Sequence, residues 1–184
     1  MNTVKEMKLE TDRLIIRPYK AADLMDCFIL MQNPDLFTYL DMEVMDFEEY
    51  KGLFTWLMDS YNREFHEDFK YSFNIILKES GKHIGWCGVG GIEFNHKQKE
   101  IYYLIGKEYW GHGYAKEAMF ALLEYCFQTI RLDSIAALCK PENIASKKVI
   151  ESLGFTYRNR IQGLTEEFDY FNGDLYYELT RENI

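Results

Sequence analysis

The clearest pattern of apolar and polar positions lies in the second half of the chain. Residues 100–105 alternate between two faces, as a β-strand does, with Ile101 and Tyr103 on one face and Glu100 and Tyr102 on the other. After two glycines, apolar side chains recur every three or four residues and form one helical stripe of Ala115, Ala118, Met119, Leu122, Leu123, Cys126 and Phe127. The pattern therefore predicts a strand, a glycine turn and a helix.

The flanking segments carry weaker patterns of the same two kinds. Helical spacing predicts helices from Asp23 to Asn33 and from Asp46 to Tyr61, the second opened by a capping box of Asp46 and Glu49. A third helix runs from 143 to 153 and is closed by Gly154. Alternation and β-prone composition predict strands at 14–17, 71–77, 83–94, 134–139, 155–161 and 175–179.

The order of these elements predicts a mixed α/β fold. A turn at 95–98 would join the strand at 83–94 to the central strand, so three consecutive antiparallel strands precede the glycine turn. The strand–helix–strand crossover that follows makes the central strand and 134–139 parallel. We expect one domain over 1–184, and the arrangement of 162–174 stays open apart from a turn at Asn172-Gly173.

Composition and charge argue against several classes of protein. The chain is 47% hydrophobic, enough for a full core, and its net charge of −9 argues against nucleic-acid binding, which needs a basic face. The charge favours a cationic partner, although many proteins are acidic for solubility alone. No apolar run reaches 18 residues and no leader pattern opens the chain, so we expect a cytoplasmic protein without a membrane span. Cysteines without a CxxC pair predict reduced, buried thiols, and the four histidines have no metal-ligand spacing, so no metal is expected.

The turn at Gly111-His112-Gly113 has two interpretations. It can be a tight connection and nothing more. It can also leave backbone N–H groups free at a helix N-terminus, an arrangement that holds a phosphate or pyrophosphate without a lysine. The turn lacks the Gly-Lys-Ser/Thr of a P-loop and the third glycine of a dinucleotide fingerprint, since Lys116 stands there.

Three motifs in order carry a resemblance to a known family. They are Leu9–Pro18 (Leu-Glu-Thr-Asp-Arg-Leu-Ile-Ile-Arg-Pro), Tyr109–Ala118 (Tyr-Trp-Gly-His-Gly-Tyr-Ala-Lys-Glu-Ala) and Asn143–Phe155 (Asn-Ile-Ala-Ser-Lys-Lys-Val-Ile-Glu-Ser-Leu-Gly-Phe). Together they resemble the GNAT superfamily of acetyl-CoA-dependent N-acetyltransferases, most of all the branch that acetylates ribosomal-protein N-termini. The resemblance implies a splayed, mostly antiparallel sheet with one central parallel pair and helices on both faces. It also implies acetyl-CoA as co-substrate and an amine acceptor.

The resemblance further implies a cofactor site. The family's pyrophosphate loop, Gln/Arg-x-x-Gly-x-Gly/Ala, falls on 110–115, with tryptophan replacing Gln/Arg as in the ribosomal-protein-like branch. Backbone N–H groups of 111–116 would bind pyrophosphate, and exposed strand backbone near 104–105 would pair with pantetheine. Asn143 would hydrogen-bond near the pantetheine or thioester; it can also be a plain N-cap, and the two roles are compatible. The implied set is Leu104, Ile105, Trp110, Gly111, His112, Gly113, Tyr114, Ala115, Lys116, Asn143 and Ser146.

Two residues are candidates for the chemistry. Glu100 lies where many family members place a carboxylate, and a carboxylate can take the proton that an amine must lose before attack; alternatively it is a solvated strand end beside Lys97 and Lys99. Ser146 matches a serine of the ribosomal-protein-like branch that could donate a hydrogen bond to the CoA sulfur. Alternatively, it is an ordinary residue in the first turn of a helix. The tyrosine that many members use as acid is replaced by Ile150. No cysteine suits an acyl-enzyme, so direct attack is expected.

The acceptor is left open by the sequence. An α-amine costs about 1 kcal/mol to deprotonate at pH 7 and a lysine amine roughly 4.6 kcal/mol, which slightly favours a protein N-terminus. The alternative acceptors are a polyamine, an amino acid or an aminoglycoside. A separate alternative is that the chain is a GNAT protein that binds acyl-CoA without catalysis. Either a monomer or a homodimer is expected.

Overall fold

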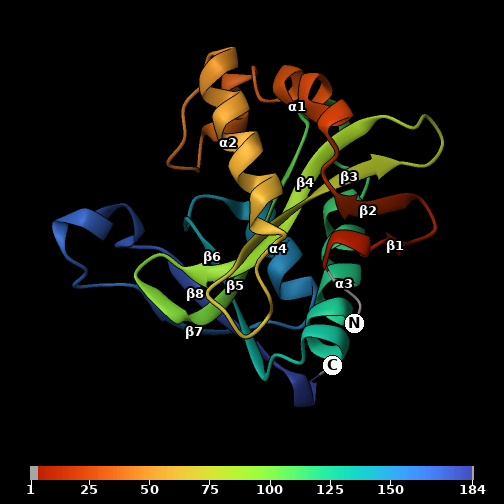
Figure 1. The fold of residues 1–184 in the computed structure, drawn as a ribbon. Helices are drawn as coiled ribbons and strands as arrows, with labels where there is room; N and C mark the ends of the chain where they lie inside the picture. Colours follow the sequence, from red (N-terminus) through yellow and green to blue (C-terminus); the bar gives the residue numbers. More distant parts are fainter. Residues whose placement is uncertain (1–3, 184) are drawn as a thin grey trace.

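The protein forms one eight-stranded sheet with helices on both faces (Figure 1). We describe residues 4–183 of a computed structural model, so the first three residues of the segment searched for a leader lie outside the description. The strands stand in the order β1-β2-β3-β4-β5-β6-β8-β7. Their bounds are β1 Leu9–Glu10, β2 Leu14–Pro18, β3 Lys70–Leu77, β4 His83–Ile92, β5 Asn95–Ile105, β6 Ser134–Cys139, β7 Thr156–Arg160 and β8 Leu175–Thr180.

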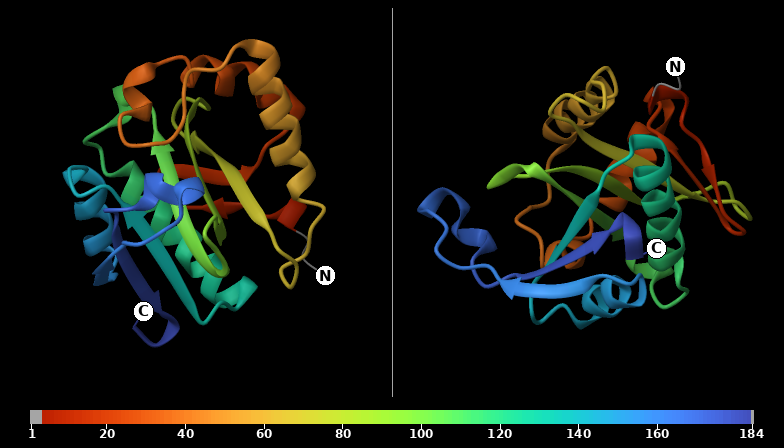
Figure 2. Two further views of the ribbon diagram at one scale, coloured as in Figure 1. Left: turned by 90° about the vertical axis from the view of Figure 1, so that its left-hand side faces the viewer. Right: turned by 90° about the horizontal axis from the view of Figure 1, so that it is seen from below.

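Within the described residues, four α-helices flank this sheet. They are α1 (Leu24–Leu30), α2 (Phe47–Ser60), α3 (Tyr114–Tyr125) and α4 (Ile144–Ser152). Helices α1 and α2 lie over one face, and α3 packs on the other with α4 beside it (Figure 2). The predicted capping box begins α2, since Asp46 accepts from the Glu49 N–H and Glu49 from the Asp46 N–H. The structure thus confirms the mixed α/β fold with helices on both faces.

The central parallel pair is short. β5 and β6 pair at one position, Glu100 with Ala136, whereas β4 and β5 pair along most of their length. Beyond Glu100 the two parallel strands diverge. The sheet is therefore split at its C-terminal edge, next to the start of α3.

Two predictions of element bounds were wrong. The turn expected at 95–98 belongs to β5, and the hairpin turns at Glu93 and Phe94 instead. The first residues of β5 are exposed, so polar side chains there suit a projecting strand as well as they suit a turn. The helix expected to end at Phe127 leaves α-geometry after Tyr125 and continues as a π-helical turn, Cys126–Ile130.

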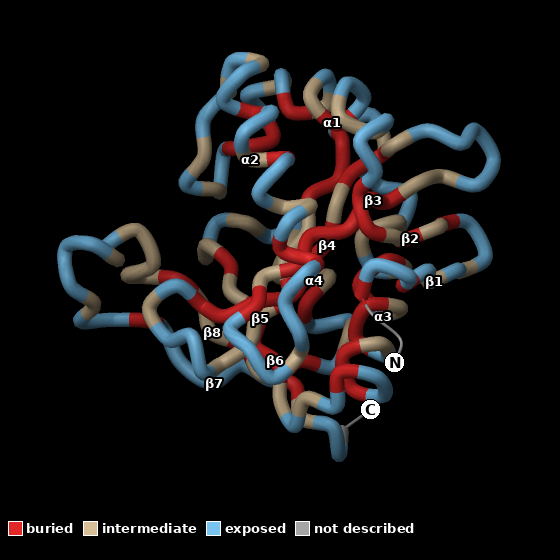
Figure 3. Tube along the Cα trace, in the orientation of Figure 1, coloured by how far each residue is buried: buried red, intermediate tan, exposed pale blue. Residues whose placement is uncertain are grey.

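Buried side chains concentrate in the middle of β3, β4 and β5 and on the inner side of α3, whereas β7 is exposed along its length (Figure 3). All four cysteines are buried with free thiols, as the sequence predicts. Within residues 4–183, the helices are all too short or too polar to cross a bilayer.

The packing of α3 gives a first prediction. Leu122 is 0% exposed between α3 and the sheet, so Leu122→Ala removes buried methyl groups and leaves a cavity. We expect a loss of about 2–5 kcal/mol in the free energy of unfolding, measured by urea denaturation. Phe120, on the same helix but 52% exposed, is the control. A Phe120→Ala variant that is destabilised as much as Leu122→Ala would contradict this packing.

Candidate functional site

The site begins where the glycine turn enters α3. Gly111 and Gly113 adopt φ of 78° and 80°, in the left-handed region that side chains disfavour. Gly113 is the N-cap and makes no side-chain cap, so the first N–H groups of α3 have no acceptor within the helix. These N–H groups and the helix dipole make the turn suited to an anion.

The opening segment of the chain holds this turn in place. Arg13 donates from Nη1 to the His112 carbonyl at 2.9 Å and from Nε to Glu117 Oε2 at 2.7 Å. Glu117 also accepts from the Thr11 hydroxyl and the Arg13 N–H. Burial opposes ionisation of Glu117, but these hydrogen bonds outweigh it and lower the pKa of its carboxyl. Sequence analysis singled out this segment as a motif without seeing that it braces the turn.

A cavity of about 740 Å³ extends from the turn to the split in the sheet, and we call it the loop cavity. Ten of the eleven residues in the implied cofactor set line it; His112 is the exception. The His112 ring turns back, with Nδ1 2.9 Å from the Trp110 carbonyl oxygen and the ring stacked on Tyr114. The structure therefore brings the set together, and His112 contributes to the turn through its backbone.

The split leaves backbone of β5 facing the loop cavity. The exposed peptide groups are those of Tyr103 and Ile105, and not those of Leu104 as the resemblance implied. The Gly106 N–H bonds the Ile84 carbonyl of β4, and peptide groups alternate direction along a strand. Those of Leu104 therefore face β4, while those of Tyr103 and Ile105 face the split. The Trp110 indole donates to the Ile105 carbonyl at 2.7 Å, which fastens the turn to the strand end.

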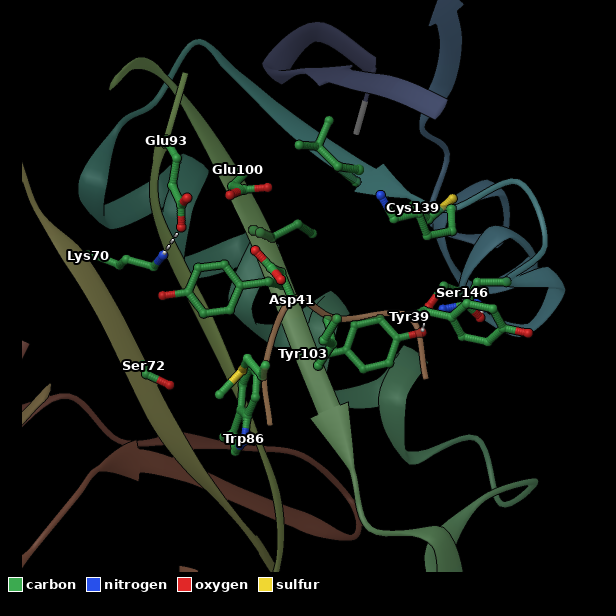
Figure 4. A pocket seen from close by; sticks show the side chains of 18 of the residues that line it. Tyr39, Asp41, Lys70, Ser72, Trp86, Glu93, Glu100, Tyr103, Cys139 and Ser146 are labelled. Carbon is green, nitrogen blue, oxygen red and sulfur yellow. Dashed lines mark hydrogen bonds and ion pairs between the residues drawn. The ribbon is translucent and has the colours of Figure 1, made fainter. Parts of the chain in front are cut away.

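A second cavity, of about 470 Å³, opens on the other side of the split. Its charged lining consists of four carboxylates, Asp41, Glu93, Glu100 and Asp174, and two lysines, Lys70 and Lys140, and we call it the acidic cavity (Figure 4). Helix α2 contributes aromatic and aliphatic lining. Six residues line both cavities and so mark where they meet: Tyr39, Leu40, Tyr103, Asn143, Ser146 and Val149.

Glu100 lies in the acidic cavity at the point where β5 and β6 part. Burial raises the pKa of its carboxyl to about 7, with Lys70 opposing the shift and Glu93 and Asp174 adding to it. Among residues 4–183 no hydrogen bond or ion pair joins the Glu100 carboxylate, whereas Glu93 pairs with Lys70 at 3.7 Å. A half-buried carboxyl with a pKa near neutrality can exchange a proton at physiological pH.

Helix α4 presents its first turn to both cavities. Asn143 is its N-cap, with Oδ1 accepting from the Ser146 N–H at 3.1 Å, so the plain structural interpretation of Asn143 applies. The Ser146 hydroxyl lies 3.1 Å from the Tyr103 hydroxyl across the split. Sequence analysis placed Tyr103 on a strand face but assigned it no role, because a contact between residues 43 positions apart leaves no local signal.

The segment left open by the sequence forms part of the acidic cavity. Residues 162–174 contain a 3-10 helix, Glu166–Phe171, that carries Tyr170 and Phe171 into the lining. The Tyr170 hydroxyl donates to the Tyr39 carbonyl at 2.7 Å, and Lys140 pairs with Asp174 at 2.7 Å. The segment is thereby joined to the chain between η3 (Pro34–Phe37) and α2.

Comparison with known sequences gives the family. A model described as an acetyltransferase (GNAT) domain matches residues 13–156. The Bacillus subtilis protein YkkB is 32% identical over 158 residues, which cover 84% of this chain and 88% of the relative. A spermidine N(1)-acetyltransferase of Vibrio cholerae is 26% identical over 162 residues, covering 88% and 87%.

Solved structures share the fold. A crystal structure of a ribosomal-protein-S5-alanine acetyltransferase from Vibrio fischeri superposes with a TM-score of 0.78 at 21% identity, covering 96% of this chain and 98% of the other. At this identity the similarity concerns the fold alone.

The glycine turn gives the second prediction. Valine at position 113 disfavours a φ of 80°, so Gly113→Val should turn the first N–H groups of α3 away from the loop cavity. We expect CoA affinity, measured by calorimetry, to fall at least about tenfold, or about 1.4 kcal/mol. Gly81→Val is the matched control, because Gly81 has a φ of 67° in the β3–β4 connection, outside both cavities. Unchanged CoA affinity in Gly113→Val would refute the assignment of the turn.

Proposed function

The chain belongs to the GNAT acetyltransferase family, and on that premise we propose that it transfers the acetyl group of acetyl-CoA directly to a primary amine bound in the acidic cavity. The observation that carries the proposal is the meeting of the two cavities at Tyr103, Asn143 and Ser146. A thioester whose diphosphate lies at the glycine turn would reach this junction along the split. An amine in the acidic cavity would meet it there, and holding both reactants in place removes much of the barrier.

The residues of the loop cavity fit acetyl-CoA. The turn supplies N–H donors and a helix N-terminus for the diphosphate. The peptide groups of Tyr103 and the Ile105 N–H offer an extended edge to the pantetheine amides, as a sheet edge does to an added strand. In this proposal N–H groups at the split also polarise the thioester carbonyl.

Glu100 takes the role of general base. The acceptor enters as an ammonium, whose positive charge suits the acidic lining, and gives a proton to the Glu100 carboxylate directly or through water before attack. Glu100 passes this first proton to solvent, and the neutral nitrogen bonds the carbonyl carbon. The carbon–sulfur bond then breaks with its electron pair on sulfur, and the nitrogen loses its second proton to Glu100 or water. No covalent acyl-enzyme is needed.

The third prediction tests this role. Glu100→Gln should lower kcat by about 10²–10⁴ and leave CoA affinity unchanged. Because the carboxyl must be ionised to accept a proton, and its pKa is raised to about 7, kcat/KM for the amine should increase with pH through about 7 in the wild type. This increase of kcat/KM with pH should be absent in Glu100→Gln. Glu124→Gln, at an exposed position of α3, is the control, and unchanged turnover in Glu100→Gln removes Glu100 from the mechanism.

A small amine with more than one positive charge is the acceptor that the lining favours. Glu93 and Asp174 are each paired with a lysine, whereas Asp41 and Glu100 have no ion pair among the described residues. Two unpaired carboxylates can serve a reacting amine and a second ammonium. Tyr170 and Tyr39 both line the acidic cavity, and the bond from the Tyr170 hydroxyl to the Tyr39 carbonyl links the two segments that carry them. We infer that this link restricts access for a folded protein.

A protein N-terminus is the second candidate acceptor. Its α-amine costs about 1 kcal/mol to deprotonate at pH 7, against roughly 4.6 kcal/mol for a lysine-type amine, so it makes less demand on Glu100. This candidate requires the segment 162–174 to open away from Tyr39.

The fourth prediction separates these acceptors. Spermidine, an alkyl monoamine and a lysine-free peptide with a free N-terminus should be compared by thiol release and mass spectrometry. We expect the highest kcat/KM for spermidine, and Asp41→Asn should lower it about two- to fivefold, the size expected of an exposed ion pair, without affecting the monoamine. A peptide that exceeds both amines in kcat/KM would replace the polyamine with the N-terminal acceptor.

A further inference from the structure

A hydroxyl pair at the junction of the two cavities has no role in the proposal so far. Tyr103 extends from β5 across the split, and its hydroxyl lies 3.1 Å from that of Ser146 on α4 (Figure 4). Either hydroxyl can be the donor in this bond. Both residues line the loop cavity and the acidic cavity, so the pair lies where the reacting thioester would be held.

The α4 position at which the resemblance implies a tyrosine acid is apolar in this chain. Ile150 lies one turn after Ser146, on the same face of α4, and is buried. It has no proton to give to a departing thiolate. CoA departs as an alkyl thiolate. Because the pKa of an alkyl thiol is roughly 8.5, the CoA sulfur ends up protonated at pH 7.

The resemblance already implies Ser146 as a donor to the CoA sulfur, and we propose that Tyr103 acts with it as one proton-donating unit, in which the Tyr103 phenol reprotonates the Ser146 hydroxyl as that hydroxyl protonates the sulfur. The inference rests on the proposed acetyl transfer and adds a catalytic residue to it. As the carbon–sulfur bond breaks, its electron pair stays on sulfur, and sulfur takes the Ser146 proton. Ser146 takes the phenol proton, and the phenolate regains a proton from solvent. The nitrogen loses two protons in all, one before attack and one as the amide forms, and solvent returns one to the phenolate, so the products are the amide, the CoA thiol and one net proton.

The surroundings of Tyr103 fit this role. Burial raises the pKa of its hydroxyl, against the lowering effect of the bond to Ser146, so the phenol holds its proton until a base forms beside it. Two other donors that line the acidic cavity are engaged elsewhere or suppressed. The Tyr170 hydroxyl donates to the Tyr39 carbonyl, and burial raises the pKa of the Cys139 thiol to about 11.

A double-mutant cycle tests the unit. Tyr103→Phe, Ser146→Ala and the double variant are compared with the wild type using acetyl-CoA and an amine that the wild type acetylates. We expect each single variant to lose about 10²-fold in kcat, the lower end of the range for general acids, because thiolate is a good leaving group. KM for acetyl-CoA and CoA affinity should stay within about twofold, and the double variant should be no more than about twofold slower than the slower single variant.

The control and the contrary outcomes are clear-cut. Tyr157→Phe, at an exposed position of β7, should match the wild type in kcat and melting temperature. Unchanged kcat in Tyr103→Phe, losses that multiply in the double variant, or a fall in CoA affinity with kcat intact would each overturn the unit. So would a loss seen in Tyr39→Phe instead of Tyr103→Phe. A wild type that acetylates no amine overturns the proposed function and the unit with it, whereas an active wild type beside an equally active Tyr103→Phe overturns the unit alone.

Discussion

The early separation of β5 from β6 is the constraint on which the rest of the structure depends. Parallel strands gain stability from continuous pairing, yet these two pair only at Glu100 and Ala136. Backbone N–H and C=O groups beyond that point need other partners. The Trp110 indole satisfies the Ile105 carbonyl, and the peptide groups of Tyr103 face the split beside the loop cavity. The split thus provides both the space and the unpaired backbone that a long, extended ligand requires.

The glycine turn is held in one conformation beside the split by residues that are distant from it in the sequence. Thr11 and Arg13 reach Glu117 and the His112 carbonyl from more than 90 residues away in the sequence. The Glu117 side chain is only 18% exposed, so its bonds are less screened than those of a surface ion pair, although the Arg13 side chain remains partly in water. With both ends of the turn fixed, its N–H groups keep one direction, and little reorganisation is needed when an anion binds.

The two cavities differ in the charge of their lining and in how far their charged groups are buried. The loop cavity presents backbone donors to a polyanion, while four carboxylates line the cavity on the other side of the split. Two of those carboxylates are neutralised by Lys70 and Lys140. Glu100 is left without an ion pair and partly desolvated, and this combination, rather than its residue type, brings the pKa of its carboxyl near neutrality.

Much of the fold could be predicted from the sequence by local rules. The stripe from Ala115 to Phe127 and the capping box at Asp46 specify their helices by periodicity and hydrogen-bonding capacity. The right-handed crossover rule fixed the parallel pair, and the glycines at 111 and 113 indicated a tight turn, in which the structure gives both a positive φ. The same local rules misplaced a turn at 95–98, because an exposed strand end has the composition of a loop.

The sequence by itself therefore determined the order and type of the main elements and the identity of the glycine turn, since these depend on residues close together in the chain. Tertiary structure alone decided which residues meet at the junction. Tyr103 reaches Ser146, Tyr170 reaches Tyr39 and Arg13 reaches the turn only because the sheet brings distant segments together. It also set the pKa of Glu100, because desolvation depends on what surrounds a group in space and has no signature in its sequence neighbours.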